Sequence, residues 1–142
     1  MKLAAFALIA CLPAAAIARQ TDHKAAHSHA LGSGDFKNSG NDAAKPAFQG
    51  GVALVHSFEY DDAAEAFREA QKADPSLALA YWLEALTYSH IIWAEEKLEA
   101  SRGALDRLAP TTEARLAKAE TDPERGFGAA GGAFYMDGGR GM

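Results

Sequence analysis

Between Lys45 and Leu108 the apolar residues recur every three or four positions, with polar and charged residues between them. This spacing is typical of amphipathic helices, because residues three and four apart share one face of a helix. The pattern therefore predicts an all-α fold. Helices are expected at 45–56, 60–74, 75–88, 94–108 and 115–119.

The second expected helix carries a stripe of small, large and small residues. Ala63, Phe67 and Ala70 follow one another at spacings of four and three, which allows two helices to cross closely around the phenyl ring. The helix is expected to end at Asp74-Pro75, because proline disfavours helical geometry in the residue before it. Asp74 is then expected to be the N-cap of the next helix.

A period of 34 residues relates the first expected helix to the third. The matched positions are Ala47 with Tyr81, Gly51 with Ala85, Leu54 with Tyr88, and His56 with His90. Together with the A-x3-F spacing and Pro75, this period is the signature of the tetratricopeptide repeat (TPR). A TPR is a helix-turn-helix unit that buries its apolar face by stacking on a neighbour. The sequence therefore predicts a short α-solenoid of TPR-like repeats over residues 45–125.

The repeat pattern divides the apolar positions into a structural core and a groove. The predicted core consists of Gly51, Leu54, Ala63, Phe67, Ala70, Pro75, Tyr81, Ala85 and Tyr88. In a TPR array the first helix of each repeat lines the concave face. The predicted partner-binding groove consists of Phe48, Val52, His56, Leu79, Trp82, Leu86 and His90. We expect it to bind a peptide or helix that presents apolar side chains. The sequence does not identify the partner protein.

Three motifs also carry a resemblance to a known family. They are His56-x-Phe58-x-Tyr60, Asp74-Pro75-x2-Ala78-x-Ala80-Tyr81-Trp82 and His90-x2-Trp93. Together they resemble the opening repeats of a group of secreted bacterial TPR proteins, which are mostly uncharacterised and usually much longer. The resemblance covers roughly residues 45–125 and implies an α-solenoid with a protein-binding role; it does not imply an enzyme. It also leaves open that the chain is a non-catalytic fragment of a longer array.

The first 18 residues have the three parts of a secretory signal peptide. Lys2 precedes an apolar run, and the tripeptide 16–18 offers small residues for cleavage after Ala18. The protein is therefore expected in the periplasm or outside the cell. Residues 8–11 also resemble a lipoprotein box, in which a lipidated Cys11 would place the chain on a membrane. Since Cys11 is the only cysteine, the mature chain has no disulfide and no thiol nucleophile.

Residues 19–44 are rich in small and polar residues and predict a flexible leader. His23, His27 and His29 lie within it, at a spacing that would present imidazoles to a transition metal if the segment were ordered. Incidental histidines in a solvated tail are the simpler interpretation, so we predict no cofactor and no metal. A metal-binding envelope protein that uses this leader is the alternative function.

Residues 126–142 are rich in glycine and predict a tail or a degenerate repeat after the repeat domain. Gly128, Gly131 and Gly132 would each cost a helix about 1 kcal/mol relative to alanine. Without a capping helix, the last repeat is expected to expose an apolar surface, unless the tail folds back over it. Self-association or a partner at this end is therefore expected.

The charge and the remaining histidines bear on the function class. The net charge of −5 becomes −6 once residues 1–18 are removed, because Lys2 is the only charged residue there. An acidic chain disfavours a nucleic-acid partner. His56 and His90 lie one period apart, so stacked repeats would bring them within about 8–10 Å. No HExxH, GxSxG or phosphate-loop motif accompanies them, and we predict that the protein is not an enzyme.

Overall fold

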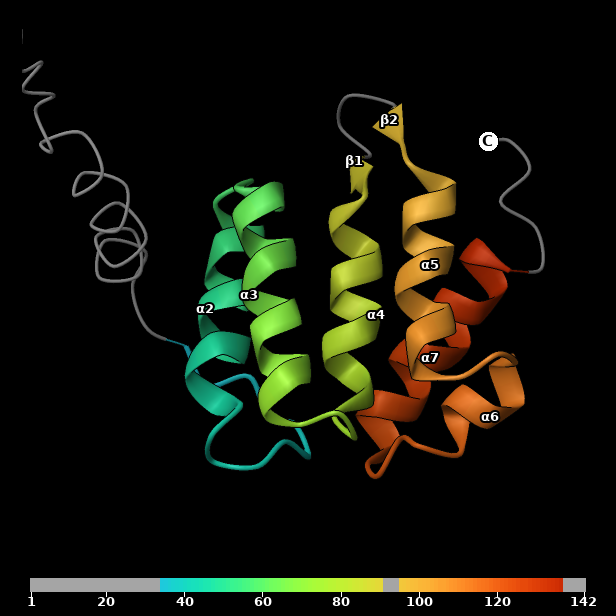
Figure 1. Cartoon of the computed structure of the whole chain (residues 1–142), viewed down its shortest axis with the longest axis horizontal. Helices are drawn as coiled ribbons and strands as arrows, with labels where there is room; N and C mark the ends of the chain where they lie inside the picture. The colour runs from blue at the N-terminus through green and yellow to red at the C-terminus, as the bar shows by residue number, and fades with distance from the viewer. Residues whose placement is uncertain (1–33, 91–94, 137–142) are drawn as a thin grey trace, which may run out of the picture.

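The computed structural model describes residues 34–90 and 95–136, and this part of the chain is mostly helical (Figure 1). The expectation of an all-α protein is confirmed. In chain order the elements are α2 (Lys45–His56), α3 (Tyr60–Ala73), α4 (Ala78–Thr87), β1 (Ser89–His90), β2 (Glu95–Glu96), α5 (Leu98–Leu108), α6 (Thr112–Leu116) and α7 (Asp122–Tyr135).

The helices from α2 to α5 each pack on the next one, side by side. The short α6 lies at one end of this row, and the long α7 packs mainly on α4 and α6 (Figure 1). Helix α4 is thus in contact with helices on both sides, and nearly all of its residues are buried. The core of the described chain is centred on this helix.

The crossing of α2 and α3 depends on a glycine facing a phenyl ring. Phe67 is fully buried, and its ring meets the ring of Phe48 edge-on at 5.9 Å between centroids. A Cβ atom at Gly51 would lie 2.7 Å from Phe67 Cε1, closer than packed atoms approach. Gly51 therefore allows the ring of Phe67 to lie directly against the backbone of α2.

The start of α4 differs from the expected one. The helix begins at Ala78, and Leu77 rather than Asp74 is its N-cap. The carboxylate of Asp74 accepts hydrogen bonds from the backbone N–H of Ser76 at 3.0 Å and from its hydroxyl at 2.6 Å. This local turn holds residues 74–77 outside the helix, because an aspartate side chain that bonds two residues ahead competes with helical geometry.

A buried ion cluster joins α3, α4 and α5. Glu84, only 1% exposed, accepts hydrogen bonds from Gln71 at 2.6 Å and from the hydroxyl of Tyr88 at 3.0 Å. Arg68 reaches the same carboxylate from α3 at 3.2 Å, and Arg107 reaches it from α5. A carboxylate so deeply buried is tolerated because it has several donors around it.

The start of α5 also differs from the expected one. Residues 95 and 96 were expected in the helix, but Ser89 pairs with Glu96 and His90 pairs with Glu95 in an antiparallel ladder. The helix therefore begins at Leu98. The intervening residues 91–94 lie outside the described part of the chain.

Helix α6 begins earlier in the chain than expected, at Thr112 rather than Arg115. Thr111 caps it, since its hydroxyl accepts a hydrogen bond from the N–H of Ala114. Arg115, 2% exposed, donates from Nε to the carbonyl oxygens of Leu105 and Ala109. It thereby provides a donor for the carbonyl of Ala109, just beyond the end of α5, and a second donor for that of Leu105, which also accepts from the N–H of Ala109.

Residues 126–135 of the glycine-rich segment, expected to form a tail or a degenerate repeat, are helical and belong to α7. Thr121 and Glu124 form a capping box, in which each side chain accepts a hydrogen bond from the other residue's backbone N–H. Pro123 stands in the first turn, where its missing N–H has no effect. The expected boundary between residues 125 and 126 therefore falls inside one helix.

Residues 36–41, which we call the N-terminal strap, were expected to be flexible but pack between α2 and α7. The ring of Phe36 lies 6.1 Å from that of Phe48 and 6.0 Å from that of Phe127. Ser39 donates from its N–H at 2.9 Å and from its hydroxyl at 2.7 Å to the buried carboxylate of Glu124. The rest of the expected leader, residues 19–33, lies outside the described part.

Candidate functional site

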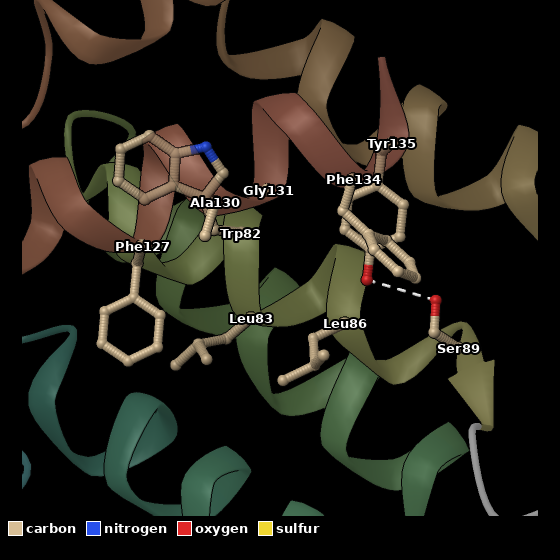
Figure 2. Close-up of a pocket in the computed structure, with 9 residues that line it drawn as sticks. All are labelled: Trp82, Leu83, Leu86, Ser89, Phe127, Ala130, Gly131, Phe134 and Tyr135. Atoms are coloured by element: carbon tan, nitrogen blue, oxygen red, sulfur yellow. Dashed lines mark hydrogen bonds between the residues drawn. The ribbon is translucent and has the colours of Figure 1, made fainter. Parts of the chain in front are cut away.

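The expected groove is closed over part of its length. Phe48, Leu79 and Trp82 were expected to face a partner, but they are 0%, 1% and 5% exposed. Trp82 is covered because α7 lies on this face of α4 (Figure 2). These three residues belong to the core, which corrects the predicted groove.

The other four residues of the expected groove do not form one surface. Leu86 is exposed and lines the pocket described below. Val52 is partly buried and packs against the core, and His56 is exposed at the end of α2. His90 is partly buried in β1, where its ring stacks on that of Tyr60 at 4.5 Å.

A pocket of about 280 Å³ lies between α4 and α7, and its lining is almost entirely apolar. Figure 2 shows the lining residues, which come from α4, from the residue that opens β1 and from α7. They are Trp82, Leu83, Leu86, Ser89, Phe127, Ala130, Gly131, Phe134 and Tyr135. A concave apolar site with few polar groups is the common form of a binding pocket.

Large apolar side chains are concentrated at this pocket. Four such residues in the described part of the chain are exposed, and three of them line the pocket: Leu86 at 37%, Phe127 at 42% and Phe134 at 40%. The fourth, Phe58, lies in the turn between α2 and α3 and is not a lining residue. Clustering of exposed apolar side chains marks interaction sites, whereas single exposed ones are ordinary.

The sequence of α7 explains the form of this pocket. Phe127 and Phe134 are seven residues apart, so they lie two turns apart on one face of the helix. Between them stand small residues, and a Cβ atom at Gly128 would overlap the indole of Trp82 and lie 2.9 Å from Leu116. The glycine allows α7 to approach α4 closely, while the two phenyl rings remain on either side of a gap.

A pair of hydroxyl groups provides the polar part of the lining. Ser89 donates from Oγ to the hydroxyl of Tyr135 at 3.1 Å, and both residues are buried (Figure 2). Burial raises the pKa of the Tyr135 hydroxyl, although the hydrogen bond from Ser89 acts in the opposite direction. The hydroxyl therefore stays protonated at neutral pH and can itself donate a hydrogen bond.

His56 and His90, which lie one period apart in the sequence, have different surroundings. His90 contacts the carboxylate of Glu95 at 3.2 Å through Nδ1 and the carbonyl oxygen of Thr87 at 3.0 Å through Nε2. The hydrogen bond from His90 lowers the pKa of the Glu95 carboxyl. Both ring nitrogens of His90 thus contact groups of its own hairpin and the adjoining helix, which is a local structural arrangement.

Two features of the described residues bear on other functions. No group of three or more His, Cys, Asp or Glu residues is placed to hold a metal ion between residues 34 and 90 or 95 and 136. The candidate ligands His23, His27 and His29 lie outside these ranges. Within the same ranges, no helix has the length and apolar character needed to cross a bilayer.

Of the pocket lining, the predicted groove contained only Trp82 and Leu86, because residues 126–142 were expected to form a tail or a degenerate repeat and not part of a site. The seven-residue spacing of Phe127 and Phe134 was the signal available. Comparison of the chain with family models, curated proteins and solved structures found no match.

Proposed function

We propose that this protein is an interaction module that binds an apolar segment of a partner protein in the pocket between α4 and α7. The observation that carries the proposal is the gathering of Leu86, Phe127 and Phe134 at that pocket. A partner side chain placed there would cover these groups and remove apolar area from water, which is the main favourable term in association.

The repeat pattern supports the same function. Two pairs of neighbouring helices, α2 with α3 and α4 with α5, follow each other at the 34-residue period of the sequence. We propose that they are TPR-like units of a short solenoid, a class of scaffold whose concave faces bind peptides. Helix α7 covers Trp82 of the expected groove, so the proposed binding surface is smaller than the full groove.

The signal-like N-terminus supports a location in the bacterial periplasm or outside the cell, with membrane attachment only if Cys11 is lipidated. The partner in this proposal is therefore an envelope or secreted protein. A metal-binding role of the leader, and a place for this chain within a longer repeat array, are the alternatives from the sequence. Titration of the purified protein with Zn²⁺, Cu²⁺ and Ni²⁺ tests the former.

The test is a capture experiment from an envelope extract with matched variants. Leu86→Ser and Phe134→Ser each remove an exposed group from the pocket, and Phe58→Ser removes an exposed ring elsewhere. We expect the unaltered protein and Phe58→Ser to retain the same partner. The two pocket variants should bind it at least about fivefold more weakly, since central apolar anchors are worth more than 1 kcal/mol each.

Each variant is first checked for helical content and for its denaturation midpoint, so that loss of binding is separated from loss of folding. Equal capture by all four proteins would refute the pocket as the binding surface.

A further inference from the structure

The indole N–H group of Trp82 is a donor without an acceptor at the pocket. The residue is 5% exposed, and its N–H makes no hydrogen bond within residues 34–90 and 95–136. In those ranges the only side-chain nitrogen or oxygen that is both sealed from solvent and unpaired belongs to Arg115, so the Trp82 nitrogen keeps contact with solvent. Its neighbouring atom Cδ1 lies 3.9 Å from the Cβ position of Gly131, which also lines the pocket (Figure 2). The N–H group can therefore donate to whatever occupies the pocket.

The hydroxyl pair of Ser89 and Tyr135 offers a second donor. The two residues are 6% and 4% exposed, and their mutual hydrogen bond uses one of the two hydroxyl protons. The other proton has no acceptor among the described residues. A buried donor without a partner costs free energy until a ligand supplies an acceptor.

The two donors lie on opposite sides of the pocket. Trp82 and Ser89 are seven residues apart, which corresponds to about 10 Å along a helix. Figure 2 shows the apolar lining between them. A ligand that satisfies both donors must therefore present two acceptors about 10 Å apart, with an apolar group between them. An extended peptide covers this length with about three residues.

The position of free acceptors distinguishes a peptide from a helix as the bound segment. Inside a helix each carbonyl group is bonded to the N–H four residues on, so free carbonyl groups occur only at the C-terminal end. An extended segment has free carbonyl groups along its whole length, with side chains between them. Of the peptide and the helix that the sequence leaves open, the two donors favour the extended peptide.

The electrostatic surroundings favour an uncharged acceptor. Residues 34–136 contain seven more acids than bases, which gives a formal net charge of −7. Burial and, to a smaller extent, the negative charge of Glu96 raise the pKa of the Tyr135 hydroxyl. A carboxylate or phosphate group would be repelled at this end of the pocket, whereas a neutral carbonyl group would not.

From these observations we infer that the pocket binds an extended peptide segment of about three residues. Its central apolar side chain enters the lining, and its backbone carbonyl groups accept from the Trp82 N–H and from the hydroxyl pair of Ser89 and Tyr135. This inference rests on the proposed function and specifies the form of the bound segment. The three polar residues then determine specificity, because a purely apolar ligand would leave both donors unsatisfied.

Two peptide probes of equal length test the inference on the full chain. The first is acetyl-Val-Leu-Val-amide, whose β-branched residues favour an extended backbone. The second is acetyl-X-Leu-X-amide, in which X is α-aminoisobutyric acid and favours a helical turn. Binding is followed by NMR titration of the indole N–H resonances. The chain has two tryptophans, so a Trp93→Phe variant assigns the resonance of Trp82.

We expect the extended probe to shift the Trp82 indole proton to lower field, as a new hydrogen bond does. It should bind at least about fivefold more tightly than the helical probe, a ratio that corresponds to one hydrogen bond of about 1 kcal/mol. Ser89→Ala combined with Tyr135→Phe should weaken binding of the extended probe by a similar factor. Ser57→Ala removes an exposed hydroxyl outside the lining and should leave binding unchanged.

Three results would overturn the inference: equal binding of the two probes, no binding of the extended probe, or binding that leaves the Trp82 resonance in place. A Trp82 resonance that moves with protein concentration in the absence of a probe would also overturn it and would assign the pocket to a second copy of this chain. The proposed function fails separately, since capture that depends on Leu86 and Phe134 would support it whichever probe binds.

Discussion

Gly128 and Gly126 provide a matched pair of substitutions that tests whether α7 packs on α4 as described. Both glycines lie within α7, two residues apart. A Cβ atom at Gly128 would overlap the indole of Trp82, whereas nothing lies within 4 Å of a Cβ atom at Gly126. The substitutions Gly128→Ala and Gly126→Ala therefore add the same methyl group in two different surroundings.

The two expected effects follow from separate terms. Replacing glycine by alanine in a helix interior stabilises it by about 1 kcal/mol in both variants. At Gly128 the methyl group also forces the buried indole or the helix to move, which costs about 1–3 kcal/mol. Because the helix term is common to both, Gly128→Ala should be less stable than Gly126→Ala by about 1–3 kcal/mol.

The assay is equilibrium unfolding in urea, followed by helical circular dichroism, with the unaltered protein as reference. Gly126→Ala should raise the midpoint, and Gly128→Ala should leave it unchanged or lower it, with equal slopes for all three proteins. If Gly128→Ala raised the midpoint as much as Gly126→Ala, the close contact between α7 and Trp82 would be refuted, together with the pocket that depends on it.

Three further outcomes are expected in the same assay. Phe67→Ala should lose about 3–5 kcal/mol, because the ring fills the crossing of α2 and α3, and an unchanged midpoint would contradict its burial. Glu84→Gln should lose about 1–3 kcal/mol, since the charged acceptor of a buried cluster is removed; retention of full stability would show that the cluster is dispensable. Burial alone would raise the pKa of the Glu124 carboxyl, but hydrogen bonds from Ser39 and Thr121 outweigh it and hold that pKa below its ordinary value of 4.5. The contribution of this carboxylate to the free energy of unfolding is therefore complete above pH 4.5 and is lost as the pH falls below that value. Glu124→Gln should weaken this acid dependence of stability. An identical pH profile for the variant would contradict the expectation.

Elements that depend on local patterns were predictable from the sequence. The stripe of Ala63, Phe67 and Ala70 placed α3, because small and large residues at helical spacing identify a buried face without reference to the rest of the chain. The all-α class followed from the same periodicity. The change of direction at Asp74-Pro75 was also expected, although the carboxylate of Asp74 bonds within the turn instead of capping α4.

Features that depend on contacts between distant residues were not predictable in this way. Gly128 lowers the helix propensity of its own segment. It also allows α7 to pack closely on Trp82, and this role is evident only from the folded structure. The same contact buries Trp82, which the repeat pattern alone had placed on an open face. Residue Phe36 likewise appears isolated in a polar stretch until Phe48 and Phe127 are brought to either side of it.

The contact between Ser39 and Glu124 has a consequence for how the domain unfolds. The two residues are 85 positions apart, so their hydrogen bonds join the first described segment to the last helix. An open solenoid frays from its ends, because each unit touches only its neighbours. Here the first described segment separates only if its hydrogen bonds to α7 break, so the first and last described segments are coupled. Unfolding is then expected to be a single cooperative transition, with closure of this long loop a late step in folding.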